Sequence, residues 1–392
     1  MSKSFSRQKP VGLPAQIVML TSARTIINTG ARMIYPLLPV FARGLDVEVA
    51  TFAIILTILQ LLGLTAPFIG QLSEQHGRRF TMLLGLGMYI VGMLLVFVSP
   101  NFVGLSAALI LASLGKIAFD PAVQAYIGDR VPYQKRGLYM GILEFGWSGA
   151  FILGVPLMTW LIAQSNWQAP FATLAIFTGF IFVAAFLLLD NDRPEKMKRA
   201  PFTTLVRQSL NSKIAIAGLF LGFGMSGANQ LISVVFGLWI EDSFGIQLAA
   251  LAAASFVVGI SELSGEGIVT VISDRFGKRR LIIISILANM VACLVLPFTA
   301  ITLTTALIGL FFFYITFETA LVASIPLASE LSPTARGMYL TVFVAAVTLG
   351  RAIATPLSTA LFTWDILGNA LMAIVFNLIA LIAVWGFIRI EE

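Results

Sequence analysis

Charged side chains occur within long apolar stretches of this chain, where a lipid environment would not tolerate them singly. These residues are Arg24, Arg32, Lys116, Asp120, Glu144, Glu262, Glu266, Glu318 and Arg351. Each charge left unpaired near the centre of a bilayer costs about 2.5 to 3.5 kcal/mol. We therefore expect these groups to pair with one another or to line a water-filled cavity, where they could bind a charged solute or a proton.

Many of these residues are spaced so that they share a helix face. The shared faces hold Arg24, Asn28, Arg32 and Tyr35; Lys116 and Asp120; and Glu262 and Glu266. Residues three or four positions apart are neighbours on a helix surface. Lys116 and Asp120 could therefore neutralise each other, so a structural ion pair and a ligand-binding role both remain open for them. For Arg24 and Glu266 the alternatives to a functional role are snorkelling to the membrane surface or a gate contact.

The acids outnumber the bases by one, which points to proton coupling. If all the bases are charged, one carboxyl lacks a partner and is expected to hold a proton. Glu262 and Glu266 lie one helical turn apart and resist double ionisation, so this pair is the first candidate. Glu144 and Glu318 are the other two predicted proton-coupling residues.

The bases and Asp120, together with several polar and aromatic residues of the same stretches, are predicted to bind substrate. The predicted substrate-binding residues are Arg24, Asn28, Arg32, Tyr35, Lys116, Asp120, Trp147, Asn229, Gln230, Tyr314 and Arg351. Guanidinium groups match carboxylates and phosphates geometrically, so the arginines leave an anionic substrate open as an alternative to a cationic one.

The composition is that of a polytopic membrane protein. Hydrophobic residues make up 58% of the chain, charged residues only 11%, and the mean hydropathy is +0.93. Soluble domains carry about 25% charged residues. The chain holds one histidine and one cysteine and lacks a phosphate-binding loop, so we expect no metal, no cofactor and no enzymatic activity. The net charge of +6 falls largely in short turns, which argues against nucleic-acid binding.

The apolar stretches predict twelve transmembrane helices, each long enough to cross a bilayer. Their approximate ranges are 14–42, 49–73, 80–98, 103–128, 137–164, 168–189, 213–240, 246–273, 281–298, 303–328, 337–363 and 366–388. Basic residues gather in the turns on the side of the termini, which places both termini in the cytoplasm and the protein in a cell membrane. No segment requires another subunit, so a monomer is expected.

The chain repeats itself at an offset of about 200 residues. The charged turn 70–79 is matched by 270–279, Arg136 by Arg336, and Pro156 by Pro356. A parallel repeat of this kind is found in some transporters. It predicts two pseudo-symmetric six-helix halves, 1–189 and 213–392, joined by a cytoplasmic linker at 190–212.

The turn at 70–79 carries a resemblance to a known family. Its pattern Gly70-x-Leu72-x-Glu74-x-x-Gly77-Arg78-Arg79 resembles the loop between spans 2 and 3 of the major facilitator superfamily, although Glu74 stands where an aspartate is usual. The resemblance implies the all-helical major facilitator fold and a secondary transporter that works by alternating access. The implied gating residues are Gly70, Glu74, Gly77, Arg78, Arg79, Arg136, Asp274, Gly277, Lys278 and Arg336.

The resemblance extends to the drug and sugar efflux branches, through stretches at 121–137 and 154–171. Two positions depart from those branches: Leu109 replaces a frequent arginine, and a Gly-Pro pair becomes Gly154-Val155. The leading expectation is a proton-coupled exporter of small amphiphilic compounds. A carrier of anionic or zwitterionic solutes or lipids is the alternative, and a non-transporting receptor or scaffold is the alternative from another class.

Overall fold

The computed structural model describes residues 12–190, 210, 212–245, 247–332 and 336–388. Within these residues the chain is helical, with no strand. The predicted linker at 190–212 lies almost wholly outside the described residues. The two groups of helices on either side of it are called the first group and the second group below.

The first group contains the helices up to α9. Its elements are α1 Leu13–Arg32, α2 Leu38–Gly44, α3 Val49–Leu62, η1 Gly63–Thr65, α4 Ala66–His76, α5 Arg78–Val98, α6 Phe102–Arg130, α7 Tyr133–Gly149, η2 Ala150–Gly154, α8 Val155–Gln164 and α9 Ala169–Leu188. The second group begins at α11. Its elements are α11 Lys213–Ser233, α12 Phe236–Phe244, α13 Leu248–Phe276, α14 Lys278–Val295, η3 Leu296–Thr299, α15 Leu303–Leu331, α16 Arg336–Leu361, η4 Phe362–Trp364, α17 Asp365–Ile382 and η5 Ala383–Phe387.

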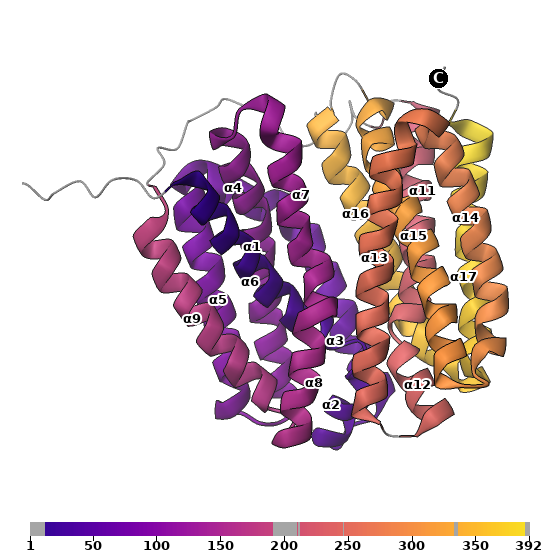
Figure 1. Ribbon diagram of the computed structural model, residues 1–392, viewed down its shortest axis with the longest axis horizontal. Helices are drawn as coiled ribbons and strands as arrows, with labels where there is room; N and C mark the ends of the chain where they lie inside the picture. Colours follow the sequence, from indigo (N-terminus) through magenta and orange to yellow (C-terminus); the bar gives the residue numbers. More distant parts are fainter. Residues whose placement is uncertain (1–11, 191–209, 211, 246, 333–335, 389–392) are drawn as a thin grey trace, which may run out of the picture.

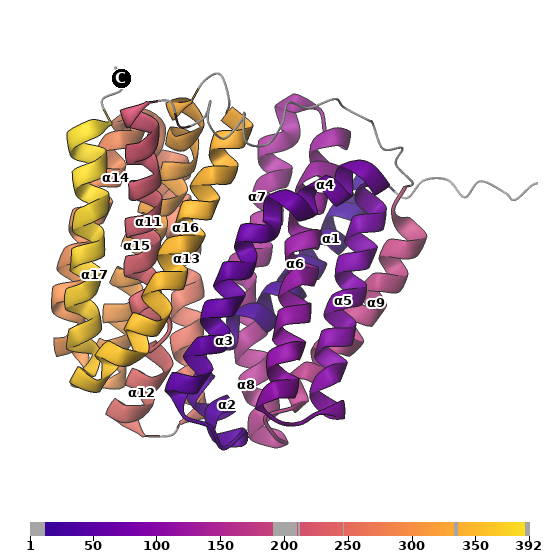
Figure 2. The ribbon, with the colours of Figure 1, turned by 180° about the vertical axis from the view of Figure 1, so that it is seen from behind.

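The two groups stand side by side with their long helices roughly upright in Figure 1, and the view from behind in Figure 2 agrees. The short helices α2 and α12 meet at one end of the molecule. Farther along, α3 packs against α16 and α8 packs against α13. The interface between the groups is therefore made by these helices.

Several helices are long and apolar enough to cross a membrane. Nine such candidates occur in the described residues, or ten if α2 and the following segment Val49–Thr65, bent by 116°, count as one span. One candidate, Arg336–Phe387, has 52 residues and contains both α16 and α17. The expected number of twelve spans thus stays a prediction.

The predicted first and seventh spans are each divided in two. The segment 14–42 was expected to be one helix, but α1 ends at Arg32 and α2 begins at Leu38, with Pro39 in its first turn. The segment 213–240 is similarly divided into α11 and α12. Pro326 and Pro356, by contrast, lie inside continuous helices.

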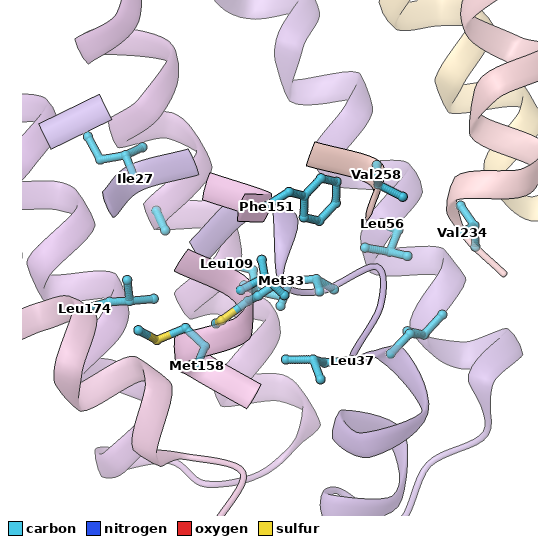
Figure 3. Close-up of a cluster of buried hydrophobic side chains, with 14 of the residues drawn as sticks. Ile27, Met33, Leu37, Leu56, Leu109, Phe151, Met158, Leu174, Val234 and Val258 are labelled. Atoms are coloured by element: carbon cyan, nitrogen blue, oxygen red, sulfur yellow. The ribbon is translucent and has the colours of Figure 1, made fainter. Parts of the chain in front are cut away.

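Buried apolar side chains from both groups form one continuous core cluster. Figure 3 shows part of it, where Phe151 of the first group lies beside Val258 of the second. The neighbouring Gly259 permits this approach, because a Cβ atom there would lie 2.7 Å from Cγ1 of Ile152. Cys293 is fully buried in the same cluster and serves packing.

Candidate substrate cavity

A cavity of about 660 Å³ lies between the two groups of helices. Its volume is within the usual range for small-molecule sites. Most of the predicted site residues line it: Arg32, Tyr35, Lys116, Glu144, Trp147, Asn229, Gln230, Glu262, Glu266, Tyr314, Glu318 and Arg351. Arg24, Asn28 and Asp120 do not line it.

Arg24 is instead tied to α6 and α7. Its guanidinium donates to Glu144 at 2.8 Å and to the carbonyl oxygen of Leu143 at 3.1 Å, and its Nε lies 3.7 Å from Asp120. Helix α7 comes this close because Gly146 has no side chain: a Cβ there would lie 3.0 Å from Cβ of Arg24. Arg24 is buried, so the snorkelling alternative does not apply to it.

Lys116 completes this network. Its Nζ donates to Asp120 at 2.5 Å and to Oδ1 of Asn28 at 2.5 Å. The Asn28 amide nitrogen in turn donates to the carbonyl oxygen of Gly146 at 2.9 Å. Arg24, Lys116, Asp120 and Glu144 thus neutralise one another inside the first group and hold α1, α6 and α7 together.

Arg32 connects the first group to the second. It forms an ion pair with Glu262 on α13, and it donates to the carbonyl oxygen of Trp147 at 2.9 Å. Its guanidinium carbon also lies 4.2 Å from the ring centre of Trp147 and 3.7 Å from that of Phe151. Arg32 and Glu262 are only 6% and 3% exposed, so each is the charge that compensates the other.

The other charged residues of the cavity remain without partners. Among the described residues, none forms an ion pair or hydrogen bond with the side chains of Glu266, Glu318 or Arg351. Glu318 is 5% exposed and packs against α13 at Gly265. A Cβ atom added at Gly265 would lie 2.9 Å from the Cβ atom of Glu318. Gly265 lies between Glu262 and Glu266 in the chain, so three carboxylates meet at this contact of α13 with α15.

Polar and aromatic groups fill the rest of the wall. The hydroxyl of Tyr35 accepts from Gln60 at 2.7 Å and from Gln230 at 3.5 Å, which again joins the two groups. The hydroxyl of Tyr314 lies 2.9 Å from that of Ser233. These contacts place the rings beside the cavity with their polar ends engaged.

Most of the residues predicted to gate occur at two similar turns, 70–79 and 270–279. Gly77 and Gly277 have φ values of 94° and 80°, which a glycine adopts without strain. Arg78 lies 3.4 Å from Asp129 and donates to Ser73 at 3.1 Å, while Arg79 donates to the carbonyl oxygen of Phe186. Each of these contacts ties the turn to its own group of helices.

Lys278 pairs with Glu330 at 2.5 Å, and Arg336 is the exposed first residue of α16. The predictions for Gly70, Glu74, Arg136 and Asp274 concern side-chain positions that lie outside the described residues. The gating roles of these four residues therefore stay predictions.

The contact of α2 with α12, which closes one end of the molecule, was not predicted from the sequence. At the junction of α2 and α12, Arg43 forms a two-pronged ion pair with Glu241. Gly237 packs so tightly there that a Cβ would lie 2.4 Å from the carbonyl oxygen of Pro36. The only signal in the sequence was a basic turn residue facing an acidic turn on the same expected side of the membrane.

The cavity lining extends from this closed end toward the opposite end. It includes Tyr35 and Phe236 near the junction of α2 and α12, and it continues to Thr270 and Ile325, near the turns with Gly77 and Gly277. A multi-pass helical protein with a charged cavity between two groups of helices is suited to pass a small solute through a membrane.

The fold and the cavity therefore define a membrane transporter rather than an enzyme. The sequence model of the Major Facilitator Superfamily matches this chain over residues 20–319 and again over 215–392. The chain belongs to the Major Facilitator Superfamily.

Related proteins agree with this assignment. An uncharacterized MFS-type transporter, YwfA of Bacillus subtilis (strain 168), is 27% identical over 353 residues, covering 84% of this chain and 82% of that protein. The multidrug resistance protein MdtG of Proteus mirabilis (strain HI4320) is 29% identical over 265 residues, or 64% of each chain. The class C tetracycline resistance protein of Escherichia coli is 23% identical over 292 residues, covering 72% of this chain and 73% of that protein.

A solved structure shares the fold. A bacterial homolog of the human lysosomal transporter Spinster, in an inward-facing and unoccupied conformation, superposes with a TM-score of 0.78 at 14% identity. The match covers 95% of this chain and 97% of that one. At this identity the likeness supports the fold alone.

Proposed function

We propose that this protein is a proton-coupled exporter of small amphiphilic compounds that works by alternating access. In this proposal twelve spans form two pseudo-symmetric halves, 1–189 and 213–392, with the linker 190–212 and both termini in the cytoplasm. The observation that carries the proposal is a cavity that combines aromatic walls with two carboxylates, Glu266 and Glu318, that lack partners among the described residues. The multidrug and tetracycline resistance relatives support export.

The proton site is assigned to Glu318 together with Glu266. The cavity charges include one more acid than bases, and Glu262 is paired with Arg32. The unpaired acid is then Glu266 or Glu318, the other two carboxylates at the contact of α13 with α15. Like charges placed close together in a water-poor site resist double ionisation. A proton and an organic cation then compete for the same carboxylates, which is the basis of exchange.

Alternating access is assigned to the two ends of the molecule. The junction of α2 and α12, closed by Arg43 and Glu241, is the gate on the outer side. The turns with Gly77 and Gly277 belong to the cytoplasmic gate. In this assignment the present conformation is inward-facing, and export requires the outer junction to open while the cytoplasmic turns close.

The test is a binding measurement at two pH values. Purified protein in detergent is titrated with ethidium, rhodamine 6G and tetraphenylphosphonium at pH 5.5 and at pH 8. We expect tighter binding at pH 8, because protonation removes the carboxylate charge that attracts the cation. Glu318→Gln should weaken binding and abolish its pH dependence, whereas Glu48→Gln, an exposed turn position, should change neither. Equal affinities at both pH values in the unmodified protein would refute proton competition.

A further inference from the structure

The two groups of helices differ in how their cavity charges are satisfied. In the first group, Arg24 and Lys116 are neutralised by Asp120 and Glu144, and Arg32 is held by Glu262. The second group contributes the cavity charges that have no ion-pair partner among the described residues. Recognition of a polar substrate therefore falls to the second group, while the first group supplies aromatic surface.

Three cavity-lining residues on helices α11, α15 and α16 of the second group have polar side-chain atoms without a partner. On α13, Glu266 and the Oε2 atom of Glu262 are likewise without one in the described structure. Glu318 on α15 is 5% exposed and makes no described hydrogen bond or ion pair. The Nε atom of Arg351 on α16 and the Nδ2 atom of Asn229 on α11 are buried and have no hydrogen-bond partner in the described structure. All three residues line the cavity, and they come from three different helices.

The charges of Glu318 and Arg351 are opposite, yet they do not pair. Glu318 lies on α15 and Arg351 on α16, two helices that contact each other, and both side chains line the cavity. Even so, no ion pair joins Glu318 to Arg351 in the described residues. Both residues line the same cavity, so both are accessible to a solute that enters it.

We propose that the preferred substrate is amphoteric: an apolar, ring-bearing compound with one cationic amine and one anionic group. The amine binds Glu318, with Glu266 close by, and the anionic group accepts from Arg351 and from Nδ2 of Asn229. The rings of Trp147 and Tyr314 cover the apolar frame. This substrate class rests on the proposed function and narrows it.

Only a substrate with both charges satisfies all of these groups. A simple cation that binds Glu318 leaves the Arg351 guanidinium without a partner, and a simple anion leaves Glu318 without one. A buried polar group that loses access to water without gaining a partner weakens binding. An amphoteric compound also adds no net charge to the cavity, so the Arg32 pair with Glu262 need not break for it to bind.

The test uses matched probes and single variants. The probes share one naphthalene frame and carry an aminoalkyl group, a carboxyalkyl group, or both, at adjacent or at opposite ring positions. Their affinities for the unmodified protein, Arg351→Gln and Glu318→Gln are measured calorimetrically at pH 7.5. The unmodified protein should bind one amphoteric probe about tenfold more tightly than either singly charged probe, a difference of about 1.4 kcal/mol, because only the amphoteric probe makes both charged contacts.

The variants should change the preference in opposite directions. Arg351→Gln should remove the advantage of the amphoteric probe over the cation and leave cation binding within about twofold, since the guanidinium contact alone is lost. Glu318→Gln should remove the advantage over the anion. Lys213→Gln and Glu48→Gln, at exposed sites remote from the cavity, are the matched charge controls. Melting temperatures without probe show that each variant is folded.

Each outcome decides between the two proposals. If cations bind with the expected pH dependence but amphoteric probes bind no better than cations, the amphoteric substrate is wrong and the proposed function stands. If the two variants weaken all the probes equally, a binding role specific to charge is contradicted. If none of the probes binds, both the substrate class and the exporter of amphiphiles are contradicted.

Discussion

At the scale of single residues, the ion pair of Arg32 with Glu262 is a buried contact between the two groups. Both side chains are buried, and the Arg32 guanidinium also stacks on Trp147 and Phe151. The pair of Arg43 with Glu241 joins the same two groups, but the Arg43 side chain is 45% exposed. The two pairs should therefore differ strongly in what the loss of one partner costs.

We predict that Arg32→Gln lowers the free energy of unfolding by about 3 to 5 kcal/mol, because it leaves Glu262 buried and uncompensated. Arg43→Gln should cost about 1 kcal/mol or less, as is usual for exposed pairs. Denaturant unfolding of the purified variants in detergent measures both. The double variant Arg32→Gln/Glu262→Gln should recover much of the loss. Similar costs for Arg32→Gln and Arg43→Gln would contradict the buried pair.

Spacing alone predicted part of this residue chemistry. The separation of Lys116 from Asp120 by one helical turn left an ion pair and a ligand-binding role both open, and the structure contains the ion pair. Partners from other helices could not be predicted, because a single sequence does not say which helix faces which. Thus Arg24 lies with Glu144 and Arg32 with Glu262, and neither pairing follows from the order of the residues.

At the scale of helices, the contact of α13 with α15 depends on a glycine. A Cβ at Gly265 would lie 2.9 Å from Cβ of Glu318 and 3.1 Å from the carbonyl oxygen of Ile315. Gly267 lies two residues further along α13, and nothing approaches its Cβ position within 4 Å. One helix therefore contains both a glycine that packing requires and a glycine that packing does not require.

We predict opposite effects of alanine at these two positions. Gly265→Ala should destabilise the protein by about 1 to 3 kcal/mol, because it forces α13 away from α15. Gly267→Ala should be neutral or should stabilise by up to about 1 kcal/mol, because alanine favours the helix. Melting temperatures of the two variants provide the comparison. Equal shifts would indicate that α13 and α15 are not in close contact.

The helices themselves were easier to predict than their breaks. The apolar stretches and the charged turns placed most long helices correctly, as at α5, α6 and α14. The break after Arg32 has a signal in the sequence, since Pro36 and Pro39 follow it and proline disfavours a helix interior. The break after Ser233 was missed, because the residues around it are as apolar as the helices it divides. The packing roles of Gly259 and Gly265 depend on neighbouring helices and left no signal in the sequence either.

At the scale of the whole molecule, the junction between α2 and α12 holds the two groups together at one end. Arg43, Glu241 and the tight approach of Gly237 to Pro36 act together there. Removal of one of these contacts should shift the population toward opening at this end, by no more than the free energy that the contact contributes.

We predict that Arg43→Gln increases the population that is open at this junction. Spin labels at positions 48 and 243 report on this end, and labels at 75 and 275 report on the other; all four are exposed. A Cys293→Ser background leaves the introduced cysteines as the only thiols, because the chain has a single cysteine. Longer distances should appear between 48 and 243 and shorter ones between 75 and 275. A change at one end alone would contradict alternating access.

The most direct test of the account is exchange of solute against protons in sealed vesicles. Proteoliposomes that are acidic inside are given a cationic or an amphoteric naphthalene probe, and probe uptake and internal pH are followed together. The account predicts uptake that is driven by the pH gradient, with proton efflux that is lost in Glu318→Gln and kept in Glu48→Gln. Probe uptake that is the same with and without the gradient, or that moves no protons, would contradict it.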